Sequence, residues 1–437
     1  MDWRRSPSWL APWLLCGVIA GCATPPTSRS ELLGESYQLI GRFYLEPVQT
    51  TTVVEASLAG LGQVDPDVTV GVIGSNLVLA RQDRPLGRYR LPAADDWRAW
   101  GDIATAATAT AVAASPAIAR LSDEELDRTL IDGAVTALDR FSLYLPPEEA
   151  RQSAIIEDGP VEAVPAQWRP GDGAVTVPQQ APAPSSAVSS AVHPFPTPSV
   201  QFRMDGAIAV VRILRFTTST ASLVQHALTR APADTRLRGV ILDLRDDPGG
   251  QIAAAADVAD LFLTQGTVVT LEGRDPWDRR VFSATFDGTI YETIPLAVLV
   301  SGRSVSAAEV LAAALQDNAR AVVIGTSTFG KGTAQRIMPL ANGGELWVTS
   351  SYMRAAAGYL LQHHGVIPDV CTRPAGSDHA ASLERLGMLI TRPRASLSEA
   401  EWTELRRLCP PSPVRFGIDG DLIVAKHLLR RQASQLR

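Results

Sequence analysis

Lysine is nearly absent from this sequence: of the 40 basic residues, only Lys331 and Lys426 are lysines. Arginine supplies the remaining positive charge, and arginine keeps its proton near neutral pH, whereas a buried lysine can lose it. Lys331 stands between two glycines in the stretch GTSTFGKGT. This placement suggests a site that needs an amine able to release and regain a proton. The simpler alternative is that one of two lysines lies there by chance.

An excess of positive charge is also lacking, because the formal net charge is −6. A general nucleic-acid binder needs a basic face to neutralise phosphates, so we expect no nucleic-acid partner. The hydrophobic content of 46% and the charged content of 20% are those of an ordinary globular protein. The 437 residues are enough for two or three domains. No internal repeat is evident.

Cysteine is scarce, and two of the four cysteines lie in an N-terminal segment that has the pattern of a signal peptide. Arg4 and Arg5 precede the apolar run WLAPWLLCGVIA, which is too short to span a bilayer as a permanent helix. The run ends in Ile-Ala-Gly-Cys22, which resembles a bacterial lipobox. That resemblance implies removal of residues 1–21 and lipid attachment at Cys22. An ordinary secretory signal with an incidental cysteine is the alternative.

The other two cysteines could pair in a disulfide if the protein is exported to an oxidising compartment. If Cys16 leaves with the signal and Cys22 carries lipid, Cys371 and Cys409 remain. A disulfide between them would close a loop of 38 residues and contribute about 4 kcal/mol in the chain-entropy model. Two buried free thiols are the alternative.

The N-terminal part of the chain, residues 22–155, is expected to be mostly helical. Apolar residues recur at helical spacing in residues 30–47 and 122–141, and the second segment starts with a capping signature at Ser122. Residues 67–82 alternate in a way that predicts a pair of strands. Residues 156–200 are rich in proline, alanine and serine without periodicity, which indicates a linker.

Residues 201–375 alternate between strand and helix patterns. This rhythm predicts an α/β core with crossover connections on a mainly parallel sheet. Two further alternating runs joined by ANGGE predict a hairpin after Lys331. We expect a C-terminal helical extension over residues 376–437. The expected strands are residues 207–214, 239–245, 295–301 and 321–325, and the expected helices are residues 220–231, 253–263 and 307–319.

The stretch GTSTFGKGT is close to a phosphate-binding loop, G-x-x-x-x-G-K. Such a loop requires a serine or threonine directly after the lysine, and a helix after that. Gly332 follows Lys331, and the next pattern is a strand. A nucleotide site is therefore excluded, and Lys331 needs another explanation.

Ser306 stands where a predicted strand has ended and a predicted helix begins. Backbone N–H groups at a helix start can stabilise an oxyanion, and a neutral lysine could take the serine proton. Lowering the pKa of Lys331 from about 10.4 towards about 7 requires about 4–5 kcal/mol of desolvation or positive neighbours. The alternative is that Ser306 only caps the helix, in a capping box with Glu309. Ser304 and Ser327 are other serines nearby.

The segment ILDLRDDPGG ends a buried-looking strand in an acidic turn with two glycines. A tight turn with positive φ explains the glycines without function. The functional alternative is that Gly249 or Gly250 donates its N–H to an oxyanion. A histidine-based hydrolase at His363 and His364 is disfavoured, because the sequence around Ser306 lacks the G-x-S-x-G elbow.

Three segments in this order resemble one protein family: GVILDLRDDPGG, VSAAEVLAAALQDNARAVVIGTSTFGKGTAQ and HHGVIPDV. They are similar to the C-terminal processing peptidases, or tail-specific proteases, of serine peptidase family S41. ALDRFSLYLPPEEA looks like the helical segment before the PDZ domain of that family, and DGDLIVAKHLL looks like its terminal helix. The resemblance implies a crotonase-like or ClpP-like α/β core over residues 201–375, with no metal and no organic cofactor.

The resemblance also implies roles for single residues. Ser306 would be the nucleophile, Lys331 its general base, and Gln335 the residue that orients the lysine. The oxyanion hole would consist of backbone N–H groups, from Ala307 and from one glycine of the pair Gly249–Gly250. Asp317 falls on a recurrent family aspartate with an accessory or structural role.

This sequence departs from the family between residues 156 and 200, where members usually carry a PDZ domain. The segment has no room for a complete PDZ domain, which puts recognition of substrate C-termini in doubt. We expect a lipid-anchored serine endopeptidase of the bacterial cell envelope, facing the periplasm and acting on proteins or peptides. A homo-oligomer or an adaptor protein stays open. The alternative function is an inactive, peptidase-like binding or scaffold lipoprotein.

Overall fold

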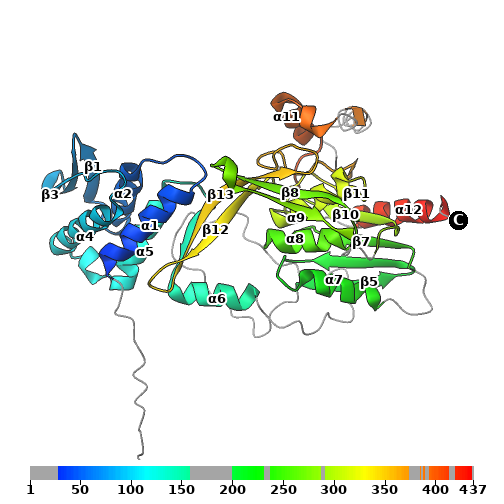
Figure 1. Ribbon diagram of the computed structural model, residues 1–437, viewed down its shortest axis with the longest axis horizontal. Coiled ribbons are helices and arrows are strands. Elements are labelled where there is room, and N and C mark those ends of the chain that lie inside the picture. The colour runs from blue at the N-terminus through cyan, green and yellow to red at the C-terminus, as the bar shows by residue number, and fades with distance from the viewer. Residues whose placement is uncertain are drawn as a thin grey trace, which may run out of the picture.

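The computed structural model describes residues 28–157, 199–230, 237–286, 291–373, 393–412 and 419–435, together with residues 384, 387 and 388. The expected signal peptide, with Cys22, and nearly all of the expected linker lie outside these residues. Figure 1 shows helices of the N-terminal region at one end of the molecule and a larger α/β core beside them. The long strands β12 and β13 reach from the core towards the N-terminal helices.

The N-terminal region contains the two helices and the strand pair that the sequence predicts. The predicted strand pair is β1–β2, and a third strand, β3, extends it to an antiparallel sheet in the order β1-β2-β3. The elements are α1 (Arg29–Phe43), α2 (Thr50–Ala59), α3 (Leu61–Val64), β1 (Val68–Ile73), β2 (Asn76–Arg81), β3 (Arg84–Arg90), α4 (Trp97–Ala114), η1 (Ile118–Arg120), α5 (Asp123–Thr136), β4 (Leu143–Leu145) and α6 (Pro147–Glu157).

Helices α1 and α5 begin at capping boxes. Ser28 and Ser122 are their N-caps, and in each helix a glutamate at the third position accepts the N–H of the capping serine. Each helix then presents apolar residues at helical spacing to a common core, for example Leu33, Tyr37 and Ile40 of α1. The caps therefore determine where the helices start, and the apolar spacing determines which face is buried.

The α/β core is built on a six-stranded sheet in the order β14-β11-β10-β7-β6-β5. All neighbouring strands are parallel except the pair β5–β6. The elements are β5 (Val200–Asp205), β6 (Ile208–Ile213), α7 (Thr220–Thr229), β7 (Gly239–Asp243), α8 (Ile252–Asp260), β8 (Gly266–Gly273), η2 (Pro276–Asp278), β9 (Arg279–Ala284), β10 (Leu296–Val300), α9 (Ala307–Asp317), β11 (Val322–Gly325), β12 (Thr333–Pro339), β13 (Glu345–Ala355) and β14 (Val370–Cys371).

The core is layered, with helices on both faces of the parallel sheet. Helices α7, α8 and α9 share one hydrophobic cluster with the sheet, and the second sheet, β12-β13-β8-β9, packs on α8 and α9. Helix α12 (Gly420–Gln435) covers the opposite face through Leu422, Ala425 and Leu429 (Figure 1). The predicted α/β class, the helical N-terminal region and the C-terminal helix are confirmed.

Strand β13 joins the core to the N-terminal region. Its first residues pair with β4, and its last residues pair with β8. Side chains near the turn between β12 and β13 pack into the hydrophobic cluster of the N-terminal helices; they are Met338, Leu340, Leu346 and Val348. One hairpin therefore contributes to both hydrophobic cores.

The C-terminal part is fastened to the core by a disulfide and by a buried ion-pair network. Cys371 and Cys409 are joined in a disulfide, with Cα atoms 6.0 Å apart, and this is the pair that the cysteine count leaves. Cys409 follows α11 (Glu399–Leu408), which comes after the short helix η4 (Arg394–Ser396). Near the start of α12, Asp419 and Asp421 bind the buried guanidinium of Arg245 at 2.7 and 3.0 Å. Within the described part of the chain, none of the helices combines the length and apolar character that crossing a bilayer requires.

Candidate active site

Ser306 lies at the start of α9, directly after the connection that leaves the carboxyl end of β10. Its backbone has φ 57° and ψ −114°, a conformation that is rare for a residue with a side chain. A helix N-cap normally has an extended backbone, so capping gives no reason for this conformation. Strained backbone is found mainly at functional sites, where the surrounding structure holds it in place. The geometry therefore favours the functional explanation of Ser306 over the cap.

The two-glycine turn lies against Ser306. A Cβ atom at Gly249, where φ is 98°, would lie 2.9 Å from the Cβ of Ser306, so this close approach requires glycine. The N–H of Gly249 donates to Asp247 Oδ1 at 2.8 Å. Among the described residues, the N–H groups of Gly250 and Ala307 have no hydrogen-bond partner. Of the predicted oxyanion donors, Gly250 and Ala307 thus remain available, whereas Gly249 is engaged.

Lys331 is largely buried, and its Nζ donates to Gln335 Oε1 at 3.0 Å. Burial lowers the pKa of this amine, and the nearby carboxylates of Asp139 and Glu309 act in the opposite direction. Among the described residues, no hydrogen bond joins Nζ to the hydroxyl of Ser306. Catalytic hydrogen bonds often tighten only when substrate binds, so the free structure does not argue against proton transfer between them.

Glu309 is fully buried one turn into α9 and holds the two predicted catalytic segments together. Its Oε2 accepts the N–H of Ser306 and the N–H of Lys331, each at 2.9 Å. Its Oε1 accepts the N–H of Gly330 and the hydroxyl of Thr328. Burial raises the pKa of Glu309 to about 7, although these four donors act to lower it. The backbones of Ser306 and Lys331 are therefore positioned by a single carboxylate oxygen.

The stretch GTSTFGKGT surrounds this carboxylate. The next element is strand β12, as expected, and not the helix that a phosphate-binding loop requires. The N–H groups that such a loop would offer to a phosphate, those of Gly330 and Lys331, here donate to the carboxylate of Glu309. A Cβ atom at Gly332 would collide with the backbone nitrogen of Gln362, so glycine is needed for the close packing of the loop.

The rival candidates have other contacts. Ser304 is buried and donates its hydroxyl to the carbonyl of Leu244 at 2.8 Å, and Ser327 donates to the carbonyl of Cys409. His364 stacks on Trp402, and its ring nitrogens contact the carbonyl of Leu360 and the carboxylate of Glu399. These side chains serve packing and connection within the fold.

Asp317 lies at the opposite end of α9 from Ser306. Its buried carboxylate accepts the N–H of Ala357 at 2.9 Å and lies 3.9 Å from the guanidinium of Arg394. Burial raises its pKa to about 6. Because ten helical residues at 1.5 Å each separate it from Ser306, Asp317 is placed to fasten α9 to its surroundings rather than to contact a reacting group.

Helix α11 supports the loop that precedes Lys331 from the outside. Arg406 donates to the carbonyls of Thr328 and His364 at 3.1 and 2.7 Å, and to the carbonyl of Phe329 at 3.3 Å. The disulfide of Cys409 lies at the end of the same helix. The lysine loop is thus held on one side by Glu309 and on the other by a helix fastened covalently to the core.

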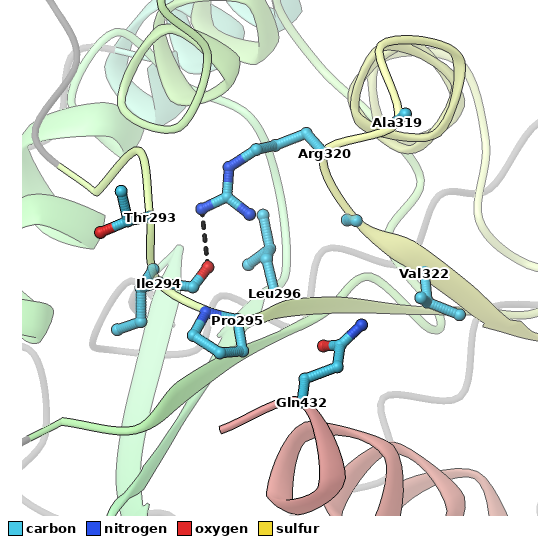
Figure 2. A pocket seen from close by; sticks show the side chains of 9 residues that line it. Thr293, Ile294, Pro295, Leu296, Ala319, Arg320, Val322 and Gln432 are labelled. Atoms are coloured by element: carbon cyan, nitrogen blue, oxygen red, sulfur yellow. Dashed lines mark hydrogen bonds between the residues drawn. The ribbon is translucent and has the colours of Figure 1, made fainter. Parts of the chain in front are cut away.

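A cavity of about 340 Å³ lies away from these residues, at the amino ends of β10 and β11. Figure 2 shows Arg320 beside it, with its guanidinium donating to the carbonyl of Ile294. The same guanidinium donates to the carbonyls of Phe262 and Tyr291, so its charge serves to hold the backbone. Ser306 follows the carboxyl end of β10, and the cavity therefore belongs to the other edge of the sheet.

Sequence reasoning recognised Glu309 only as a capping residue, and it gave no role to Asp139, Phe141 or Thr349. The sequence does carry a signal for Glu309: it lies in an otherwise apolar helix, where a buried carboxylate requires several hydrogen-bond partners. Asp139 and Phe141 lie about 190 positions before Lys331, and the pairing of β4 with β13 brings them close. Thr349 lies on the second strand of the hairpin, where its pairing partner is Gln335.

Comparison with known proteins shows what the core is similar to. Residues 207–372 match the model of the family described as Peptidase family S41. A carboxy-terminal-processing protease of Bartonella bacilliformis is 39% identical over 176 residues, which cover 39% of this chain and 40% of that protein. A carboxyl-terminal-processing protease of Synechocystis sp. is 32% identical over 203 residues, which cover 44% of this chain and 47% of that protein. Residues 207–372 are thus similar to the S41 peptidases, the family that the sequence motifs resemble.

The matched region is limited to this core, and the chain spans less than half the length of these two relatives. Among solved structures, a photosystem II D1 C-terminal processing protease is similar, with a TM-score of 0.46 and 20% identity. That similarity covers 79% of this chain and 93% of the other.

Proposed function

We propose that this chain is a serine endopeptidase in which Ser306 is the nucleophile and Lys331 the general base. The observation that carries the proposal is the strained serine at the start of α9, held by the carboxylate that also holds the backbone of a buried lysine. The curated relatives named as C-terminal processing proteases support a protein or peptide as substrate.

In the first step, the neutral amine of Lys331 takes the proton of the Ser306 hydroxyl, and the serine oxygen attacks the carbonyl carbon of a peptide bond. Negative charge develops on the carbonyl oxygen, which accepts hydrogen bonds from the N–H groups of Ala307 and Gly250. Such donors act strongly because they are already in place and shielded from water. The protonated Lys331 then gives its proton to the leaving amine, and an ester forms at Ser306.

In the second step, water replaces the amine. Lys331 takes a proton from the water, the resulting hydroxide attacks the ester carbonyl, and the same N–H groups bind the oxygen. Collapse releases the new carboxyl end, and Lys331 returns the proton to Ser306. Gln335 keeps the amine in place throughout, because its Oε1 accepts a hydrogen bond from Nζ.

Hydrolysis of unfolded casein by the purified protein tests this function, with Ser306→Ala as the control. Because only the neutral amine can act as a base and burial lowers the pKa of Lys331, the rate should rise with pH, with a midpoint below the ordinary value of 10.5. No turnover at any pH would favour the alternative, a binding or scaffold protein. A rate that fell as the pH rose towards 10.5 would contradict the assignment of the neutral amine as the base.

We further propose that the chain acts at the bacterial cell envelope, anchored through lipid on Cys22. The support comes from the sequence: the charged start, the short apolar run and the lipobox-like end. In a bacterial host, Cys22→Ala should move the protein from the membrane to the soluble fraction and remove labelling by palmitate. Unchanged labelling in that variant would refute lipid attachment at Cys22.

A further inference from the structure

A turn of the N-terminal region, residues 139–142, lies beside the lysine of the core. It follows α5 and leads into β4, which pairs with β13. Asp139 Oδ1 accepts the N–H groups of Phe141 and Ser142 at 2.6 and 2.9 Å, which closes the turn. A carboxylate that binds backbone N–H groups two and three residues onward is a usual way to fix such a turn. The turn also has contacts that its own closure does not require.

One of these contacts begins a chain of hydrogen bonds that ends at the amine. The hydroxyl of Thr349, on β13, donates to Asp139 Oδ1 at 3.2 Å. Gln335 Nε2, on β12, donates to Thr349 Oγ1 at 3.0 Å. Lys331 Nζ donates to Gln335 Oε1 at 3.0 Å. The chain thus joins a carboxylate of the N-terminal region to the predicted general base.

The direction of each bond follows from the chemistry of its members. An ionised carboxylate only accepts, so Thr349 must give its proton to Asp139. The oxygen of Thr349 is then left to accept, and only the NH₂ group of Gln335 can donate to it. The oxygen of the Gln335 amide must therefore face Lys331. Without the carboxylate, the Thr349 hydroxyl could turn and the amide could adopt either orientation.

The same turn covers the amine with an aromatic ring. The Nζ of Lys331 lies 4.8 Å from the centre of the Phe141 ring. The guanidinium of Arg140 lies 4.7 Å from the Phe141 ring and 5.3 Å from the ring of Phe329. A ring at this distance keeps water away from the amine and attracts its protonated form.

We infer that the turn of residues 139–142 is part of the active site, in which Asp139 and Thr349 are positioning residues that fix the Gln335 amide towards Lys331. The inference rests on the proposed function, in which Lys331 is the general base that takes the proton of Ser306. It extends the site beyond the core that matches the peptidase family, since Asp139 lies outside residues 207–372.

A double-mutant cycle tests the positioning role. Thr349→Val keeps the shape of the side chain and removes the hydroxyl, so kcat for unfolded casein should fall about tenfold with little change in KM, as for one lost hydrogen bond. In a Gln335→Ala background the same change should cost nothing further, because Thr349 acts through Gln335. Thr349→Ser should restore most of the rate.

A control on the same strand is Tyr352→Phe. It removes a hydroxyl that donates to Glu46 of the N-terminal region at 2.8 Å, outside the hydrogen-bond chain. This variant should keep the wild-type kcat. An equal loss from Thr349→Val in the wild-type and Gln335→Ala backgrounds would show that Thr349 supports only the fold, and would overturn the inference.

A second measurement does not depend on turnover. The charged groups that face Lys331 are Asp139 and Glu309, which favour the protonated amine, and Arg140, which disfavours it. In Ser306→Ala protein, the pH dependence of labelling by trace acetic anhydride reports the titration of Lys331, and Lys426 serves as an internal reference. Adding Asp139→Asn should lower the midpoint of Lys331 and leave that of Lys426 unchanged.

An unchanged Lys331 midpoint in the Asp139→Asn variant would overturn the inference even if the enzyme is active. Conversely, a lowered midpoint together with no casein hydrolysis by the protein that retains Ser306 would leave the contact between the turn and the lysine intact while refuting the proposed function. The two failures are thus distinguishable.

Discussion

Alanine at position 331 should abolish peptide hydrolysis. Removal of a general base typically costs about 10²–10⁴-fold in rate, and the other lysine of the chain, Lys426, lies on α12. Lys331→Arg should be equally inactive, because a guanidinium keeps its proton near neutral pH. The measurement is kcat for unfolded casein, with circular dichroism to show that each variant is folded.

The other lysine of the chain provides a matched control. Lys426 lies on α12, where its Nζ donates to Asp205 at 2.8 Å, on the side of the sheet opposite to α9. Lys426→Ala should keep the wild-type rate. Undiminished turnover by Lys331→Ala would rule out the lysine as the base and with it the proposed dyad.

Alanine at position 309 should remove activity and destabilise the fold by about 3–5 kcal/mol, because it leaves several buried donors without an acceptor. These donors include the N–H groups of Ser306, Gly330 and Lys331. Glu309→Gln should also be harmful, since its NH₂ group would face two of the donors. The free energy of unfolding in urea and kcat measure the two effects.

A second glutamate separates this role from capping. Glu125 occupies the same position of a capping box in α5, but it is exposed and its carboxylate bonds to the capping residue Ser122. Glu125→Ala should cost much less stability than Glu309→Ala, because its carboxylate is exposed to water, and should leave kcat unchanged. If Glu309→Ala cost no more than Glu125→Ala, the carboxylate of Glu309 would be a cap and nothing more.

Much of the core could be predicted from the sequence because its elements have strong local patterns. Strands such as β7 and β10 are continuous apolar runs, which is typical of a parallel sheet covered on both faces. Helix α9 is buried along nearly its whole length and begins at a recognisable serine. The loop before β12 could be distinguished from a nucleotide-binding loop, because Gly332 follows the lysine and a strand pattern comes next.

Other parts had weaker or nonlocal signals. Helix α4 buries Ala104, Ala107 and Ala111 at helical spacing, but alanine also lies on its exposed side, so the periodicity is faint. The pairing of β4 with β13 joins residues about 200 positions apart, and no local pattern specifies such a partner. The contact of Asp139 with Thr349 depends on that pairing, and the sequence therefore could not reveal it.

The hairpin of β12 and β13 links the α/β core to the N-terminal region. Its turn end buries Met338, Leu340, Leu346 and Val348 among the N-terminal helices, while its other end positions Gln335 and Thr349. A fragment that begins at residue 200 would retain all residues of the family match, but it would expose these four apolar side chains to water. We therefore expect the core to depend on the N-terminal region for its stability, and the two parts to unfold in one cooperative transition.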